Sequence, residues 1–264
     1  MEHEAIIRLG IFVGLFGLLA LAESYLPRRA RSVPRSARWT TNWGIVILDT
    51  LTLRLLAVAM PLLAIGAALD AGQRDWGLFN QLAWPLWLEA VLAVLILDFL
   101  IWLQHVVTHR VPLLWRFHQV HHADPDMDVT TAIRFHPVEI AVSMLLKIGA
   151  VYLLGPAALA VLIFEVLLNG MAMFNHANLA LSRRQDAALR MLIVTPDMHR
   201  IHHSVHRAEH DTNYGFSLSV WDRLFGTYKA EPEAGHMAMR TGLDLPAAAR
   251  PEALFWSLRL PFRR

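Results

Sequence analysis

The sequence contains no cysteine among its 264 residues. Disulfide bonds, iron–sulfur clusters and thiolate-bound haem are therefore excluded, and any metal ion must be held by nitrogen or oxygen ligands. Charged residues are also scarce: they make up 17% of the chain, against about 25% in an average soluble domain, while hydrophobic residues make up 55%. The chain also lacks a P-loop and a G-x-G-x-x-G motif after a strand. This composition is typical of an integral membrane protein.

Five hydrophobic runs approach or exceed the roughly 20 apolar residues that cross a bilayer as a helix. They lie at 6–26, 43–69, 84–103, 138–154 and 156–174. The last two are near the short limit, and Gly155-Pro156 between them predicts a tight turn, so we expect a helical hairpin there. Backbone polar groups must be paired within lipid, which favours helices for runs of this length. The expected fold is an all-α integral membrane protein with four to five transmembrane or re-entrant helices and a cytoplasmic, histidine-rich helical cap.

The loop between the first two runs carries basic residues and no acidic ones: Arg28, Arg29, Arg31, Arg35 and Arg38. The positive-inside rule places this loop in the cytoplasm, or on the cytoplasmic side of the inner membrane in a bacterium. Counting spans onward from it places every histidine-rich segment on that same side. Ala20-Leu21-Ala22 resembles a signal-peptide cleavage site, but the residues before the run are net acidic and the arginines follow it. We therefore expect a retained anchor.

Three short motifs concentrate histidine: HVVTH at 105–109, HQVHH at 118–122 and HRIHH at 199–203. Residues three and four apart share one face of an α-helix, so each motif presents its imidazoles in one direction. Imidazole nitrogen is a common ligand for iron, zinc, copper and nickel. Eight imidazoles exceed the needs of one ion. The sequence thus predicts two metal ions, with these ligands: His105, His109, His118, His121, His122, His199, His202 and His203.

Asp98 shares a predicted helical face with Trp102, His105 and His109, about two turns deeper in the membrane. An ionisable group at that depth normally has a partner. Two roles stay open for it. It accepts a hydrogen bond from an imidazole N–H and so orients that ring, or it is satisfied elsewhere within the helical bundle.

The order of these motifs resembles that of the fatty acid hydroxylase and sterol desaturase superfamily. RFHP after the second motif, FNHAN before the third, and the segment HHSVHRAEHDTNYGFSLSVWDRLFGTY are similar to its bacterial members. The resemblance covers about residues 98–228. We expect a single membrane domain over 1–264 with this histidine-box core, followed by a cytoplasmic or interfacial tail over 229–264.

The resemblance implies a di-iron centre, with zinc able to replace iron during isolation, and dioxygen as co-substrate. It also makes His176, in FNHAN, a further metal ligand. Four residues are expected to lie behind the ligands: Asp98, His136, Asn178 and His206. For His136 a ligand role stays open as well, and for His206 and His210 a surface position. His3 and His236 are expected at the surface.

Members of this superfamily hydroxylate or desaturate lipids, so the resemblance implies a lipid substrate such as a sterol, hopanoid, carotenoid, fatty acyl chain or alkylglycerol, and no nucleic acid. The metal–oxygen cofactor carries the oxidising power that side chains lack. Electrons are expected from a separate ferredoxin, cytochrome or reductase. A basic face would dock that partner or meet anionic lipid: Arg183, Arg184, Arg190, Arg200 and Arg207.

Two other functions stay open. A zinc-dependent membrane hydrolase also uses imidazole, although catalytic zinc usually needs three protein ligands and H-E-x-x-H is absent. A metal transporter or sensor would place ligands within the spans and on both faces of the membrane, whereas these histidines lie at one side.

Overall fold

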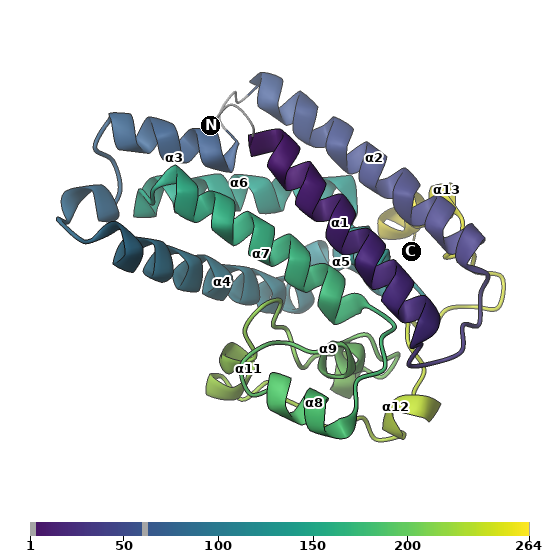
Figure 1. Ribbon diagram of the computed structural model, residues 1–264. Helices are drawn as coiled ribbons and strands as arrows, with labels where there is room; N and C mark the ends of the chain where they lie inside the picture. Colours follow the sequence, from purple (N-terminus) through teal and green to yellow (C-terminus); the bar gives the residue numbers. More distant parts are fainter. Residues whose placement is uncertain (1–3, 60–62, 264) are drawn as a thin grey trace.

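The structure is a computed structural model that describes residues 4–59 and 63–263 (Figure 1). Its elements are α1 (Glu4–Tyr25), α2 (Arg35–Ala59), α3 (Ala64–Gln73), η1 (Phe79–Gln81), α4 (Leu86–Arg110), α5 (Pro112–His122), η2 (Thr131–Ile133), α6 (Pro137–Leu154), α7 (Ala158–His176), α8 (Arg183–Leu189), α9 (Pro196–His202), α10 (Arg207–His210), α11 (Val220–Leu224), α12 (Gly235–Ala238), α13 (Leu254–Arg259) and η3 (Leu260–Phe262). Within the described residues there are isolated β-bridges but no strand. The predicted all-α class is confirmed.

Within the described part of the chain, five helices are long and apolar enough to cross a membrane: Ile6–Tyr25, Arg35–Val58, Leu86–Arg110, Pro137–Leu154 and Ala158–His176. Large apolar side chains on their outer faces are exposed, such as Leu55 at 72%, Val58 at 84% and Leu153 at 78%. An apolar surface of this extent requires a covering, which lipid supplies. The protein is a multi-pass membrane protein.

The expected span over 43–69 is wrong in its extent. α2 begins at Arg35, and a separate helix, α3, begins at Ala64. Residues 60–62, between these two helices, lie outside the described part. α3 has 10 residues, too short to span a bilayer, and packs against α6 and α7.

Helix α7 lies at the centre of the long helices, in contact with α1, α3 and α4, while α2 packs on α6. The short helices α8, α9, α11 and α12 form a cap at one end of the long ones (Figure 1). The C-terminal end of α7 reaches this cap and contacts α9. Helix α5 follows α4 after a single residue and starts at Pro112, whose fixed φ suits the first turn of a helix.

Two fully buried arginines hold α5 against α2. Arg38 pairs with Asp124 and Asp128, each at 2.6 Å. Arg134 donates at 2.8 Å to the Val120 carbonyl oxygen and at 2.8 Å to Asn42 Oδ1. A buried guanidinium is tolerated when its N–H groups find several acceptors, as both do here. The helix that carries HQVHH is thereby fixed in place.

The arginine-rich loop lies at the same end of the molecule as the histidine motifs. Arg28 pairs with Asp197 of α9 at 3.0 Å, and Arg29 donates to the Met239 carbonyl oxygen at 2.6 Å. These arginines therefore tie the start of the chain to the cap.

The expected turn between α6 and α7 is confirmed at Gly155, which has φ 63°. A Cβ added there would lie 2.3 Å from the Trp76 carbonyl oxygen. We expect Gly155→Ala to lower the free energy of unfolding by about 1–3 kcal/mol, seen as a lower thermal melting midpoint. The matched control is Gly149→Ala in the same helix, where nothing lies within 4 Å of an added Cβ. That change should be neutral or slightly stabilising. Equal effects of the two changes would contradict the strain argument.

Candidate metal centre

The nine histidines predicted as ligands come from four helices and meet where the long helices join the cap. All nine are buried. They are His105 and His109 on α4, His118, His121 and His122 on α5, His176 at the end of α7, and His199, His202 and His203 on α9 and its C-terminal cap.

These side chains form two groups, and within each group the ligand nitrogens lie within 4.8 Å of one another. The five-histidine group is His105, His109, His118, His122 and His202; the four-histidine group is His121, His176, His199 and His203. The two H-x-x-H-H motifs are used in opposite senses. In HQVHH the i, i+4 pair, His118 and His122, belongs to the five-histidine group. In HRIHH the i, i+4 pair, His199 and His203, belongs to the four-histidine group. Each motif gives its remaining histidine to the other group, so both motifs bridge the two groups.

The facing nitrogens are separated as ligands of one ion would be. His105 Nε2 lies 3.1 Å from His118 Nε2. His176 Nε2 lies 3.1 Å from His121 Nε2, and 3.2 Å from the Nε2 atoms of both His199 and His203. Imidazole nitrogens about 2.1 Å from one ion stand roughly 3 Å apart when the angle between them is near 90°. One pair in the five-histidine group and three pairs in the four-histidine group have this spacing.

Backbone carbonyls behind three rings fix which nitrogen faces inward. The Nδ1 atoms of His105, His176 and His202 lie 2.7, 2.7 and 2.8 Å from the carbonyl oxygens of Tyr214, Ala172 and Thr212. A carbonyl oxygen only accepts, so each Nδ1 carries the hydrogen and each Nε2 presents a lone pair. Lone pairs that face each other repel unless a cation lies between them.

Several buried ring nitrogens have no hydrogen-bond partner among the described residues: Nε2 of His109 and His202, and both nitrogens of His122. Unpaired buried nitrogens are costly in a closed site. The residues present therefore fit a metal ion in each group.

Carboxylates stand behind two further rings of the five-histidine group. Glu139 Oε1 lies 2.6 Å from His118 Nδ1, and Asp211 Oδ1 lies 3.4 Å from His109 Nδ1. A carboxylate in this position orients the imidazole and raises its basicity as a ligand. Glu139 could not be predicted from the sequence, because a single acidic residue in the first turn of α6 has no distinguishing pattern.

Burial, and then repulsion by neighbouring imidazoles, lowers the pKa of the ligand rings outside the membrane-spanning helices well below the ordinary range of histidine. These rings are His121, His122, His199, His202 and His203. They are neutral near pH 7. Metal binding requires this state, because a protonated imidazole has no lone pair to donate.

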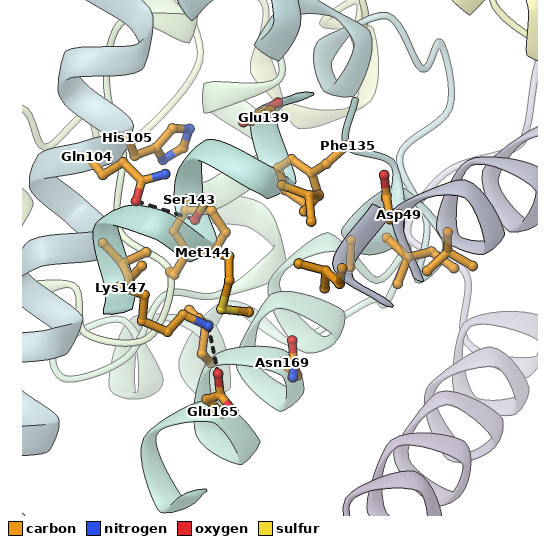
Figure 2. A pocket seen from close by; sticks show the side chains of 18 of the residues that line it. Asp49, Gln104, His105, Phe135, Glu139, Ser143, Met144, Lys147, Glu165 and Asn169 are labelled. Carbon is orange, nitrogen blue, oxygen red and sulfur yellow. Dashed lines mark hydrogen bonds and ion pairs between the residues drawn. The ribbon is translucent and has the colours of Figure 1, made fainter. Parts of the chain in front are cut away.

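A cavity of about 320 Å³ adjoins the histidines, and His105 and His118 form part of its wall. In Figure 2 His105 and Glu139 lie at one end, and Lys147 and Glu165 lie at the other, deeper in the helical bundle. A second, apolar groove of about 450 Å³ runs between α4, α5 and α6, and residues such as Ile101, Gln104 and Lys147 line both spaces. The histidines are thus reached through a cavity that borders a groove among the membrane helices.

Comparison with known proteins gives the family. Residues 90–227 match the family model for fatty acid hydroxylase, just over half of the chain. The chain belongs to the fatty acid hydroxylase family. It is 32% identical over 149 residues to ornithine lipid hydroxylase OlsE of Rhizobium tropici, covering 56% of this chain and 44% of that protein. It is 32% identical over 163 residues to alkylglycerol monooxygenase of Homo sapiens, covering 60% of this chain and 34% of that protein.

The chain therefore spans less than half the length of these two relatives. A third relative, fatty acid hydroxylase vlmA of Lecanicillium sp, is 23% identical over 227 residues, covering 80% of this chain and 59% of that protein. No solved structure gives a significant match. The predicted superfamily is confirmed.

Three residues expected to support the ligands of this hydroxylase-family centre do not touch them. Asp98 Oδ2 accepts from Trp221 Nε1 at 2.9 Å and from the Leu218 backbone N–H at 3.3 Å, while its buried Oδ1 has no hydrogen-bond partner among the described residues. Asn178 exchanges hydrogen bonds with the Arg29 backbone. His206 is exposed. None of their described contacts involves an imidazole ring. For Asp98 and His206 these contacts agree with the alternatives that the sequence left open, a partner within the bundle and a surface position, and a supporting role for the three residues stays a prediction.

The remaining histidines are also placed by the structure. His136 is no member of either group: it caps α6, and its Nδ1 accepts from the Val138 N–H at 3.1 Å. It thus acts at the helix end that carries Glu139. His210 is buried and stacks on Trp115 beside the five-histidine group. His236 is half-buried and pairs with Glu231 at 3.1 Å, so it is not a free surface residue. His3 lies outside the described residues.

Asp222, which no sequence motif singled out, positions the loop behind His105. Its carboxylate accepts from the backbone N–H groups of Tyr214 and Gly215 at 2.9 and 2.8 Å, and from Trp102 Nε1 at 3.0 Å. Tyr214 supplies the carbonyl oxygen that meets His105 Nδ1. Asp222 therefore holds a ligand in place through a neighbouring peptide.

The pKa shifts of the histidines predict how the metal-free protein responds to acid. In the folded state these rings resist protonation, whereas in the unfolded chain they take up protons below about pH 6.5. The unfolded state then binds more protons, so the stability of the metal-free protein should fall as the pH drops from about 6.5. Thermal melting between about pH 8 and pH 5 measures this.

Asp124 does not contribute to the change in stability between about pH 8 and pH 5. Its burial raises its pKa but the Arg38 charge outweighs this and lowers it to about 2, so the carboxyl stays ionised throughout. A melting midpoint that is independent of pH over this range would contradict the assignment of buried neutral histidines.

Proposed function

We propose that this protein is a membrane-bound di-iron oxygenase that hydroxylates, or desaturates, a C–H bond of a lipid with dioxygen and external electrons. The observation that carries the proposal is the pair of buried histidine groups beside a cavity among the membrane helices. The family match supports it, as do the names of the relatives, a lipid hydroxylase and a monooxygenase.

The histidine ligands are suited to two iron ions. Together with dioxygen, these ions would supply an oxidant strong enough to attack an unactivated C–H bond. The chain's own residues hold and shield that chemistry. The carbonyls of Tyr214 and Ala172 and the Glu139 carboxylate keep ligand rings in orientation. The ring of Phe135 stacks 4.3 Å from that of His121 and covers the site on the cavity side, where it excludes water.

Hydroxylation places one oxygen atom of dioxygen in the product and reduces the other to water, which consumes two electrons and two protons. We propose a separate donor of these electrons, such as a ferredoxin, cytochrome or reductase. Exposed Arg183, Arg184 and Arg207 offer a basic docking surface for it. Arg190 and Arg200, expected on the same surface, are instead buried and paired with Asp186 and Asp197.

We also propose that the histidine groups face the cytoplasm. The support is that the arginine-rich loop contacts the cap that carries HRIHH, because a basic loop of this kind is retained on the cytoplasmic side.

The test is the origin of the product oxygen. Full-length protein, purified without oxygen, loaded with iron and given a reductant, membrane lipid and isotopically labelled dioxygen, should yield a lipid product with one labelled oxygen atom if it hydroxylates. Desaturation would give an oxygen-dependent product with two hydrogens fewer. About one zinc ion per chain and no oxygen-dependent product under any loading would instead favour a zinc hydrolase.

A further inference from the structure

The cavity beside the histidines is lined by ionisable side chains at membrane depth. Three of these side chains, Glu165, Lys147 and Arg8, lie deep in the cavity. The Glu165 carboxylate pairs with Lys147 at 2.8 Å and with Arg8 at 2.9 Å. This carboxylate is therefore matched by two cations. Two other acidic residues line the same cavity nearer the metal centre, Asp49 from α2 and Glu139 from α6. Figure 2 shows them on the side of the cavity away from the Lys147–Glu165 pair.

Both of these carboxylates have an oxygen atom without a partner. Asp49 is 5% exposed, and its Oδ1 has no hydrogen-bond partner among the residues described. Glu139 uses Oε1 for His118, while its buried Oε2 is unpaired in the same part of the chain. A buried carboxylate oxygen without a hydrogen-bond donor is costly at membrane depth, and a cation that enters this cavity would supply donors to both oxygens.

The apolar groove shows where the rest of such a ligand would lie. It shares Ile101, Gln104, Thr108, Glu139 and Lys147 with the cavity. Its outer rim carries exposed apolar side chains on α4, α5 and α6, such as Val107 at 40%, Leu113 at 63% and Leu146 at 55%. A molecule with a small polar head in the cavity and an alkyl chain in the groove would therefore reach the lipid phase.

We propose that the cavity binds the cationic amine of a lipid headgroup between Asp49 and Glu139, with an acyl chain of the same lipid in the groove between α4 and α6. The interpretation of this amine site as a substrate site rests on the proposed function. A lipid bound in this way would have the carbons next to its amine beside His105 and His118. The amine donates to the two free carboxylate oxygens, and its charge offsets theirs.

The experiment compares the affinity of full-length, metal-loaded protein in detergent for three single-chain probes. Palmitoyl-putrescine has a free primary amine, its N-acetylated form has none, and monopalmitoylglycerol is a neutral diol. We expect the amine to bind roughly tenfold or more tightly than either neutral probe, the size of one charge-assisted contact. Equal affinities, or a preference for the diol, would overturn the proposal without any variant.

Two substitutions locate the preference. Asp49→Asn keeps the shape and removes the charge, so it should reduce the preference for the amine to within roughly threefold. The matched control is Asp244→Asn, whose side chain is 86% exposed, and it should keep the full preference. A preference that survives Asp49→Asn would refute the assigned site.

Metal content and oxygen-dependent product, measured on the same samples, separate this proposal from the proposed function. Amine-selective binding by protein that makes no oxygen-dependent product would refute the oxygenase and leave the amine site standing. Product formation without amine selectivity would do the reverse.

Discussion

Replacing His202 with alanine should abolish the lipid product and leave the chain with one metal ion instead of two. His202 is the residue of HRIHH that belongs to the five-histidine group, and its Nε2 has no partner among the described residues. Its loss also breaks the contact with the Thr212 carbonyl oxygen. Loss of a ligand should cost more than the roughly 10- to 100-fold typical of residues behind a ligand, so we expect activity below about 1%. Product assay and metal analysis of the same sample measure both effects.

His121→Ala makes the same test on the four-histidine group, where His121 Nε2 faces His176 Nε2 at 3.1 Å. The matched control is His206→Ala, because His206 is exposed and follows HRIHH closely in sequence. The control should retain both ions and full activity. Full activity with two bound ions in either His202→Ala or His121→Ala would show that the ligand assignment is wrong.

Arg38→Met should produce the largest loss of stability among single changes outside the metal centre. Arg38 is fully buried and donates to both Asp124 and Asp128, and methionine fills similar volume without a charge. Two buried carboxylates would lose their cation, a change that costs about 3–5 kcal/mol. For a chain of this size that lowers the thermal melting midpoint by roughly 10 °C. The end of α5 would also be released, so metal content should fall with it.

The control for this change is Arg74→Met. Arg74 also pairs with an aspartate, Asp70, but its side chain is 55% exposed and water replaces the lost contact. Its melting midpoint should match that of the wild type. If Arg38→Met were as stable as Arg74→Met, the buried pair would not be what holds α5 in place.

The histidine groups could be predicted because their pattern is local. Offsets of three and four residues fix which side chains share a helix face, so HQVHH and HRIHH implied converging imidazoles before any fold was known. His176 stands alone in its segment, and only the family resemblance pointed to it. The division of each motif between two groups could not be predicted, because it depends on how α5 and α9 face each other.

The residues that support the ligands could not be predicted from spacing. Asp98 does share a helix face with His105, but the cap brings Trp221 to it across a long separation in sequence. Glu139 and Asp222 are single acidic residues whose roles arise only when α6 meets α5 and when the cap folds back on α4. Hydrophobic runs predicted the membrane helices well, except that the second run is divided between α2 and the short helix α3.

The number of metal ions bound to one chain is the most direct test of the two-metal centre. Native mass spectrometry of protein loaded with ferrous iron in the absence of oxygen should show two ions per chain, and His206→Ala should show the same. Both ions should be retained together at neutral pH, because the two groups share both H-x-x-H-H motifs. A single ion per chain at saturating iron, or none, would contradict a two-metal centre built from these nine histidines.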